Sequence, residues 1–164
     1  MAANSEVGLT TSGGQAAPSW RRRLWRYGPL LLWLGFIFYA STNSFSAANT
    51  SRIIEPLLRW LAPNITKAQL LSAHFIVRKC AHFTEYALLA LLAARAFLSS
   101  TKHALRHRWL ISTLVLVAVY ALLDEYHQAF VPTRTPSIYD SMIDTAGGLT
   151  ALVVLALWRK KRRN

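Results

Sequence analysis

The sequence predicts an all-α integral membrane protein: a bundle of four transmembrane helices with an extra interfacial amphipathic helix between the first two. Three observations lead to this fold class. Hydrophobic residues make up 53% of the 164 residues. They are gathered in runs close to the roughly 20 residues that a bilayer core requires. Lys and Arg, 19 against 7 Asp and Glu, are clustered at the ends of those runs, as is typical of membrane flanks.

Composition also limits the class of function. The length suits one domain. A basic chain often binds nucleic acid, but the cations here flank apolar runs and no nucleic-acid motif stands out, so we expect no nucleic-acid partner. Cys80 is the only cysteine, which excludes an intramolecular disulfide and a metal cage of thiolates.

The N-terminal region is predicted to contain a tail and the first span. Residues 1–19 are rich in Gly, Ala, Ser and Thr without a hydrophobic period, which is typical of a disordered tail. The run from Leu24 to Ser41 is near the short limit for a core of about 30 Å. It also fits a signal peptide, but we favour a retained helix because aromatic residues bracket the run and three further spans follow.

A short amphipathic helix is predicted after the first span. Apolar residues recur there at helical spacing and oppose charged ones: Ile53, Ile54, Leu57, Leu58 and Leu61 against Arg52, Glu55 and Arg59. Pro56 is expected near its first turn, where a missing amide hydrogen is tolerated. Together with Trp60, the pattern indicates a helix on the membrane surface. Thr66 and Gln69 then form a capping box, so the second spanning helix is expected to begin near Lys67.

Three further apolar runs complete the bundle, at about residues 80–98, 109–123 and 141–158. The third span continues into polar residues 124–128. In the fourth, Gly147 and Gly148 predict a close approach between helices. Residues 20–158 are therefore expected to form one transmembrane domain, followed by a basic cytoplasmic tail at 159–164.

Loop charges predict the orientation. The flank before span one carries four Arg, the region between spans two and three carries four cations, and five more follow span four, 13 in all. The other two loops carry 6. The positive-inside rule therefore places both termini in the cytoplasm.

Five of the seven acidic residues lie within or beside the apolar spans, and this orientation brings all five near the outer membrane face: Glu85, Asp124, Glu125, Asp140 and Asp144. Two imidazoles and three cations fall there as well: His82, His127, Arg78, Lys79 and Arg134. An ionised side chain in apolar surroundings costs roughly 2.5–3.5 kcal/mol. We therefore expect these residues to share one hydrated pocket.

Helical spacing supports a shared pocket. Residues three, four or seven apart lie on one helical face, and three such sets occur: Arg78, His82 and Glu85; Asp124, His127 and Gln128; Ser137, Asp140 and Asp144. The first set lies at the start of span two, the second at the end of span three, and the third at the start of span four.

Arginine suits a phosphate group because its planar fork binds two oxygens at once. Arg78 and Arg134 are interpreted in this way, whereas Lys79 is interpreted as an interfacial anchor. Ser137 and Ser141 are either nucleophiles or caps of the fourth helix, and capping is preferred. His74, before the main cluster, is expected to be exposed and outside the site.

The remaining polar residues have two interpretations. His82, Glu85, Asp124 and His127 form either a general acid–base set or a polar network that ties three helices together. Function is favoured because ionisable residues inside a membrane are usually functional. Glu125 and Gln128 are expected to support the set. His and carboxylates also suit a divalent metal, but no fixed-spacing metal motif occurs, so a metal is not favoured.

The same residues form motifs in a fixed order: Arg78-Lys79-x-x-His82-Phe83-x-Glu85-Tyr86, Asp124-Glu125-x-His127-Gln128-x-Phe130-x-Pro132-x-Arg134, Ser137-x-x-Asp140 and Gly147. This set, over about residues 25–158, resembles the VanZ-like family. The resemblance implies a bacterial membrane protein related to proteins of glycopeptide-resistance clusters associated with teicoplanin resistance. It also implies that the chain is an enzyme that acts on lipid head groups or lipid-linked envelope precursors. Two positions depart from the family pattern: Thr133 stands where many relatives have Gly, and Asp144, where Asn is common, adds a negative charge.

The expected function is an enzyme of the bacterial cytoplasmic membrane, with its site facing outside, that cleaves or exchanges a phosphate-linked head group. Its expected partners are membrane lipids or lipid-linked envelope precursors. The expected roles are proton transfer by His82 or His127 and a carboxylate (Asp124 first), orientation by Glu85 and Asp140, and substrate binding by Arg78, Arg134, Gln128 and Glu125. The alternative is a non-enzymatic protein whose polar cluster binds a lipid or antibiotic, or only packs helices. Transport is disfavoured, because transporter sites lie near the bilayer midplane between repeats.

Overall fold

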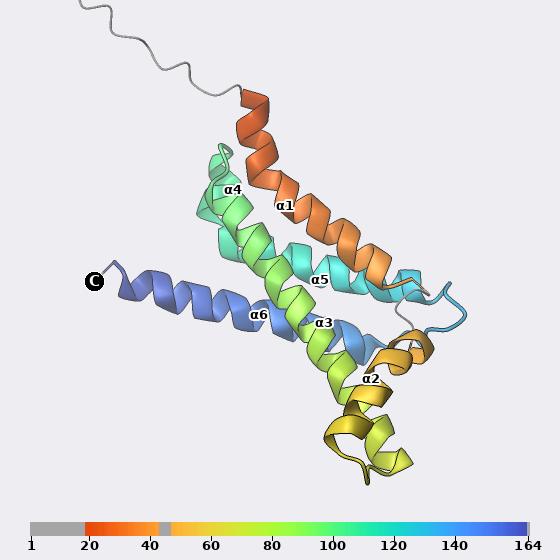
Figure 1. Ribbon diagram of the computed structural model, residues 1–164. Coiled ribbons are helices and arrows are strands. Elements are labelled where there is room, and N and C mark those ends of the chain that lie inside the picture. The colour runs from red at the N-terminus through yellow and green to blue at the C-terminus, as the bar shows by residue number, and fades with distance from the viewer. Residues whose placement is uncertain (1–18, 43–46, 164) are drawn as a thin grey trace, which may run out of the picture.

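The computed structural model describes residues 19–42 and 47–163, and all regular secondary structure within these residues is helical (Figure 1). The helices are α1 (Ser19–Ala40), α2 (Ala47–Leu61), α3 (Lys67–Leu98), α4 (His103–His107), α5 (Trp109–Gln128) and α6 (Ile138–Lys161). The predicted all-α class is confirmed. Residues 1–18 of the predicted tail lie outside the described residues. Ser19, the last residue of the predicted tail, begins α1.

Among the described residues, three helices are long and apolar enough to cross a membrane: α3, α5 and α6. α1 does not meet the same criterion. Its first turns carry Arg21, Arg22, Arg23 and Arg26, so the apolar stretch begins only at Tyr27. The 14 residues from Tyr27 to Ala40 span about 21 Å as a helix, which is shorter than a core of about 30 Å.

α3 is the central helix of the bundle. It packs against α1, α2, α5 and α6, and Figure 1 shows α6 crossing it. The side of α3 that enters the core is lined with small residues beside two larger ones: Ala90, Ala93, Ala94, Tyr86 and Leu89. Small side chains let neighbouring helices approach closely, as is common where membrane helices pack.

The predicted close approach at the two glycines is confirmed. A Cβ added to Gly147 would overlap the backbone carbonyl of Phe83 in α3, and one added to Gly148 would lie 2.6 Å from Cγ1 of Val117 in α5. The backbone of α6 therefore rests directly against its two neighbours. Because Asp144 lies one turn before Gly147, the same contact brings that carboxylate close to α3.

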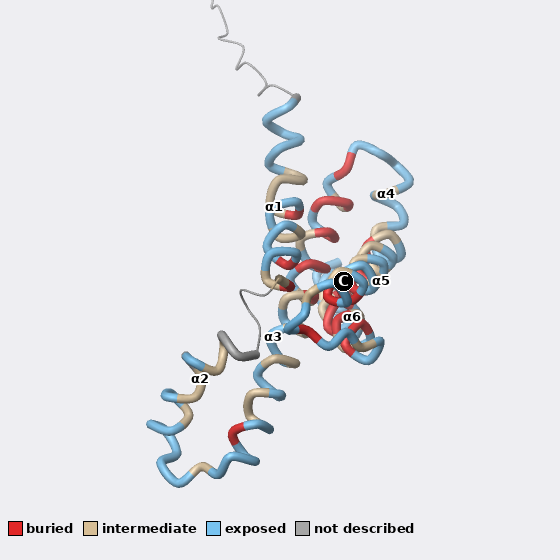
Figure 2. Tube along the Cα trace, turned by 90° about the vertical axis from the view of Figure 1, so that its right-hand side faces the viewer, coloured by how far each residue is buried: buried red, intermediate tan, exposed pale blue. Residues whose placement is uncertain are grey.

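α2 and the first turns of α3 form a helical hairpin that projects from the bundle (Figure 2). The capping box starts α3 at Lys67 as predicted: the Thr66 amide donates to Gln69 Oε1 at 2.9 Å, and the Gln69 amide donates to Thr66 Oγ1 at 3.3 Å. With 32 residues, α3 is about 48 Å long, longer than a bilayer core. Pro56 was expected near the first turn of this helix, and this prediction is wrong. α2 begins earlier, at Ala47, so Pro56 lies inside the helix.

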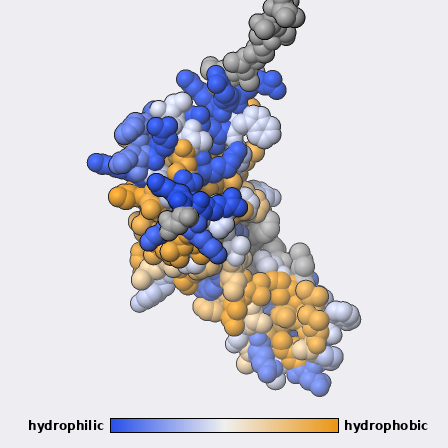
Figure 3. All heavy atoms as spheres, turned by 90° about the vertical axis from the view of Figure 1, so that its left-hand side faces the viewer, coloured by the Kyte–Doolittle hydropathy of each residue, from blue (hydrophilic) through white to orange (hydrophobic). Residues whose placement is uncertain are grey.

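Hydrophilic and hydrophobic surfaces are separated along the molecule. Hydrophilic side chains gather where α1 begins, at α4 and at the end of α6, whereas hydrophobic side chains cover much of the hairpin, with hydrophilic ones at its tip (Figure 3). Trp60, Leu71 and Phe75 are exposed on the hairpin, and Leu123 and Val154 are exposed on α5 and α6. Exposed apolar patches of this extent mark a membrane or interaction surface in a folded protein.

Candidate functional site

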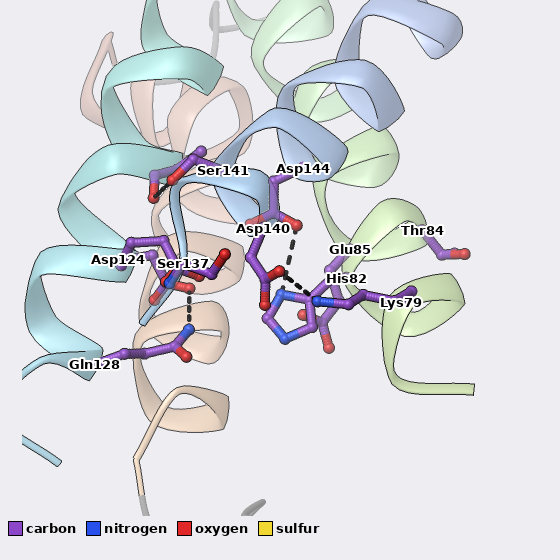
Figure 4. A network of polar contacts seen from close by, with 12 residues as sticks. Lys79, His82, Thr84, Glu85, Asp124, Gln128, Ser137, Asp140, Ser141 and Asp144 are labelled. Carbon is purple, nitrogen blue, oxygen red and sulfur yellow. Dashed lines mark hydrogen bonds and ion pairs between the residues drawn. The ribbon is translucent and has the colours of Figure 1, made fainter. Parts of the chain in front are cut away.

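Polar side chains from α3, α5 and α6 meet at one end of the bundle (Figure 4). α3 supplies His82 and α6 supplies Asp144, whose Oδ1 lies 3.4 Å from His82 Nδ1. α5 supplies Asp124, and one ligand atom from each of these three residues lies within 4.8 Å of the others. We call His82, Asp124 and Asp144 the central cluster.

The central cluster is shielded from solvent. Asp144 is fully buried and Asp124 is 5% exposed. Neither carboxylate oxygen of Asp144 has a hydrogen-bond partner among residues 19–42 and 47–163. Burying an ionised carboxylate without hydrogen bonds is costly, so Asp144 is the least satisfied acidic group of the site.

Hydrogen bonds between and within α5 and α6 support the cluster. Gln128 Nε2 donates to Asp124 Oδ2 at 3.0 Å, one turn along α5. The backbone amide of Ser137 donates to Glu125 Oε2 at 2.6 Å. The Ser141 hydroxyl donates to the Ala121 carbonyl at 3.3 Å. Glu125 and Gln128 thus hold other protein groups.

Ser137 is the N-cap of α6, as predicted, and its hydroxyl accepts a hydrogen bond from the Tyr139 amide at 3.3 Å. The cap satisfies an amide hydrogen that has no partner within the helix. It also fixes where α6 begins, and with it the positions of Asp140 and Asp144 further along the helix.

A cavity of about 160 Å³ lies beside the central cluster, between α1, α2 and α3. Its wall includes both predicted phosphate-binding arginines, Arg78 and Arg134, together with His82 and Glu85. Thr50 and Ile54 of α2 cover another side. Asp124 and Asp144 are not part of this wall, so His82 is the residue that joins the cavity to the buried carboxylates.

The two arginines differ in their partners. Arg134 Nη2 donates to the carbonyls of Ala40 and Thr42, at 2.6 and 3.3 Å. Arg78 has buried Nε and Nη2 atoms without a hydrogen-bond partner in the described part of the chain. Burial lowers the pKa of the Arg134 guanidinium, and the like charge of Arg78 lowers it further, yet arginine stays cationic at neutral pH. The cavity is therefore a cationic recess with unused donors.

Two residues of this region differ from the prediction. Lys79 was interpreted as an interfacial anchor, but its ammonium group pairs with Asp140 of α6. His74 was expected to be exposed, but it lines the cavity. Spacing could have identified both, because Lys79 lies three residues before His82 and His74 lies four before Arg78 on the same helix.

His127 is not brought to the central cluster. Its ring centroid lies 4.3 Å from that of Phe38 in α1, and it is not part of the cavity wall. The reason is geometric: successive residues of an α-helix are rotated by about 100°. Gln128 and His127 therefore lie on opposite sides of Asp124, and Gln128 is the one that donates a hydrogen bond to it within the described residues.

A comparison with protein families agrees with the motifs. The family model described as VanZ/LLP1 matches residues 27–159. No curated protein and no solved structure matches the chain significantly. The chain belongs to the VanZ/LLP1 family.

Proposed function

We propose that this VanZ/LLP1 protein is an outer-leaflet enzyme of the bacterial cytoplasmic membrane that cleaves or exchanges a phosphate-linked head group of a lipid or lipid-linked envelope precursor. The observation that carries the proposal is Arg78: two nitrogens of its guanidinium, Nε and Nη2, are buried without a partner in the described residues, on the wall of a cavity that Arg134 also lines. Such a group requires an anionic partner, and phosphate oxygens suit its geometry.

Acid–base groups lie next to the proposed phosphate position. Glu85 and His82 share the cavity wall with the arginines, so they are the groups placed to move protons as the phosphate–oxygen bond to the head group breaks. Water or an acceptor hydroxyl then forms the new bond to phosphorus. Asp124 and Asp140 act indirectly: Asp124 lies behind His82, and Asp140 holds Lys79.

The proposal includes a topology with α1 as a fourth span and both termini in the cytoplasm. Contacts at both ends of α1 support this. At one end Arg95 Nη2 donates to the Trp25 carbonyl at 3.0 Å, and at the other Arg134 donates to Ala40. α1 thus runs beside the bundle from its cation-rich end to the cavity. In this topology the cavity faces outside and α2 lies at the outer membrane surface.

Cysteine labelling tests the topology. In a Cys80→Ser background, a membrane-impermeant maleimide applied to intact cells is expected to label Thr135→Cys but not Lys102→Cys. Both positions are exposed, so accessibility within the protein does not separate them. If Lys102→Cys is labelled and Thr135→Cys is not, the protein has the opposite orientation and the proposed topology is wrong.

Mass spectrometry of membrane lipids tests the chemistry. Cells producing the wild-type chain are expected to contain a lipid or lipid-linked precursor with an altered head group that is missing with Arg78→Gln. Arg59→Gln is the matched control, because Arg59 is exposed on α2 and, within the described part of the chain, forms its ion pair with Glu55 alone. Saturable lipid binding without any altered product would instead support the non-enzymatic alternative. Teicoplanin susceptibility of the same strains tests the link to resistance.

A further inference from the structure

The central cluster has the composition of a cation site. It offers one imidazole nitrogen and two carboxylate oxygens, each from a different helix, within 4.8 Å of one another. One His with two carboxylates is a ligand set that suits borderline divalent ions such as Zn²⁺ and Mn²⁺. Sequence spacing alone does not reveal the set, because its members lie on α3, α5 and α6.

Burial of Asp144 is a second and independent observation. The side chain is fully buried, yet both of its oxygens lack a hydrogen-bond partner within the described residues. His82 Nδ1 lies 3.4 Å from Asp144 Oδ1, an ion pair when the imidazole is protonated, and it also lacks a hydrogen bond there. In Figure 4 the Asp144 carboxylate points toward His82. A cation between the two groups would satisfy both.

The charges around the cluster also leave room for a cation. Five carboxylates gather in this region with three basic side chains, a formal difference of two negative charges. The bases have other positions: Lys79 pairs with Asp140, Arg134 donates to carbonyls, and Arg78 lines the cavity. Among residues 19–42 and 47–163, Asp124 and Asp144 have no Lys or Arg partner within ion-pair distance. One divalent ion balances this charge.

We propose that His82, Asp124 and Asp144 bind a divalent cation of the Zn²⁺ or Mn²⁺ type. Gln128 positions one ligand, because its hydrogen bond to Asp124 Oδ2 leaves Oδ1 for the ion, as outer hydrogen bonds commonly do in metal sites. Three protein ligands leave a further position for water or substrate. With a metal bound, His82 is a ligand, and Glu85 is the proton carrier on the cavity wall. The cation site itself does not depend on the proposed reaction.

The test is metal binding by the full chain in detergent. A second source of zinc binding is first removed: His103 and His107 of α4 lie four residues apart with ring centroids at 5.7 Å, a spacing that binds zinc on helices. In a His103→Ala, His107→Ala background, protein stripped with a chelator is dialysed against Zn²⁺ or Mn²⁺, and bound metal is counted by elemental mass spectrometry. About one equivalent of at least one ion is expected.

Isosteric substitutions identify the ligands. Asp144→Asn and Asp124→Asn are expected to weaken binding at least tenfold, since even outer-shell changes cost 10- to 100-fold. Glu55→Gln, an isosteric change in the exposed Arg59–Glu55 pair of α2, is expected to bind metal as the parent does. The added metal is also expected to raise the melting temperature of the parent but not of Asp144→Asn, which separates ligand loss from misfolding.

The proposed cation site and the proposed reaction can be rejected by different results. Absence of bound metal in the parent, or unchanged affinity in both Asp124→Asn and Asp144→Asn, would overturn the cation site even if lipid turnover persists. Conversely, Arg78→Gln is expected to keep its metal while losing turnover. A chain that binds one equivalent but alters no lipid would support the site and reject the proposed function.

Discussion

The two ends of the bundle both carry charge, but they hold it in different ways. Where α6 ends, the cations are exposed, and two of them lie over aromatic rings: Arg162 is 3.9 Å from the Trp158 centroid and Arg159 is 5.7 Å from that of Trp109. At the cavity end, Arg78 and Asp144 are withdrawn from solvent with polar atoms unpartnered in the described residues. Water solvates the first set, whereas burying the second without hydrogen-bond partners costs free energy. Burial, more than the amount of charge, distinguishes a membrane anchor from a site.

Replacing one arginine at each end of the bundle, in separate variants, tests this comparison most directly. Arg78→Gln is expected to lower lipid turnover by about 100-fold, a typical loss for a donor that stabilises developing negative charge. Arg106→Gln, in the exposed α4 region, is expected to change turnover by less than about twofold. Head-group release in proteoliposomes measures both. Equal losses would show that both ends act through general attraction of anionic lipid.

Packing near the site is expected to be less tolerant than packing toward lipid. Gly147→Ala places a methyl group on the Phe83 carbonyl, and overpacking of this kind costs about 1–3 kcal/mol. At Gly35 in α1 an added Cβ meets nothing within 4 Å, so Gly35→Ala is expected to be neutral or to stabilise by up to about 1 kcal/mol. Thermal unfolding in detergent separates them. A destabilised Gly35→Ala protein would contradict the packing described for α1.

A partly buried ion pair and an exposed one are expected to contribute different amounts to the free energy of unfolding. Asp140→Asn removes the partner of Lys79, whose side chain is only 20% exposed. The expected loss is roughly 1–3 kcal/mol, less than for a fully buried pair because Lys79 keeps some contact with solvent. Glu55→Gln breaks a pair exposed by 46% and 40%, and such pairs contribute about 0.3–0.5 kcal/mol. Similar unfolding midpoints for the two variants would remove the distinction.

A small effect on turnover is expected at His127. It contacts Phe38 and does not line the cavity, so His127→Ala should change turnover by less than about threefold, within the range of an indirect packing effect. His82→Ala should abolish turnover. If His127→Ala is equally inactive, the histidine that turnover requires has been wrongly identified as His82.

Much of the fold could be predicted because it depends on local patterns. Hydropathy placed the apolar spans, the Thr66–Gln69 box placed the start of α3, and the paired glycines indicated where α6 meets its neighbours. A membrane-spanning role for α1 is harder to predict, because the arginines that indicate its orientation also shorten its apolar stretch. Whether it crosses a bilayer depends on lipid and neighbouring helices, which a run of residues does not encode.

The site was predictable as a set of residues but not as a set of contacts. Periodicity shows which residues share a face of one helix, yet partners across helices depend on the rotation and depth of each helix. For this reason Lys79 and His74 were placed outside the pocket, and His127 was grouped with Asp124. Asp144 was expected in the pocket without a role, because its closeness to His82 comes from the packing of α6 on α3.

Gly147 and Gly148 contact different neighbours at consecutive positions, so α6 is held in the corner between α3 and α5 by its main chain. Neighbouring residues of a helix point about 100° apart, and turning α6 about its axis would drive its backbone into one neighbour or the other. The distance between the backbones of α6 and α3 near Asp144 is consequently limited by the contact of Gly147 with the Phe83 main chain, which has no rotamers to adjust. Tightening around a ligand at this end must therefore come from the side chains themselves or from α1 and α2, which lie across the cavity.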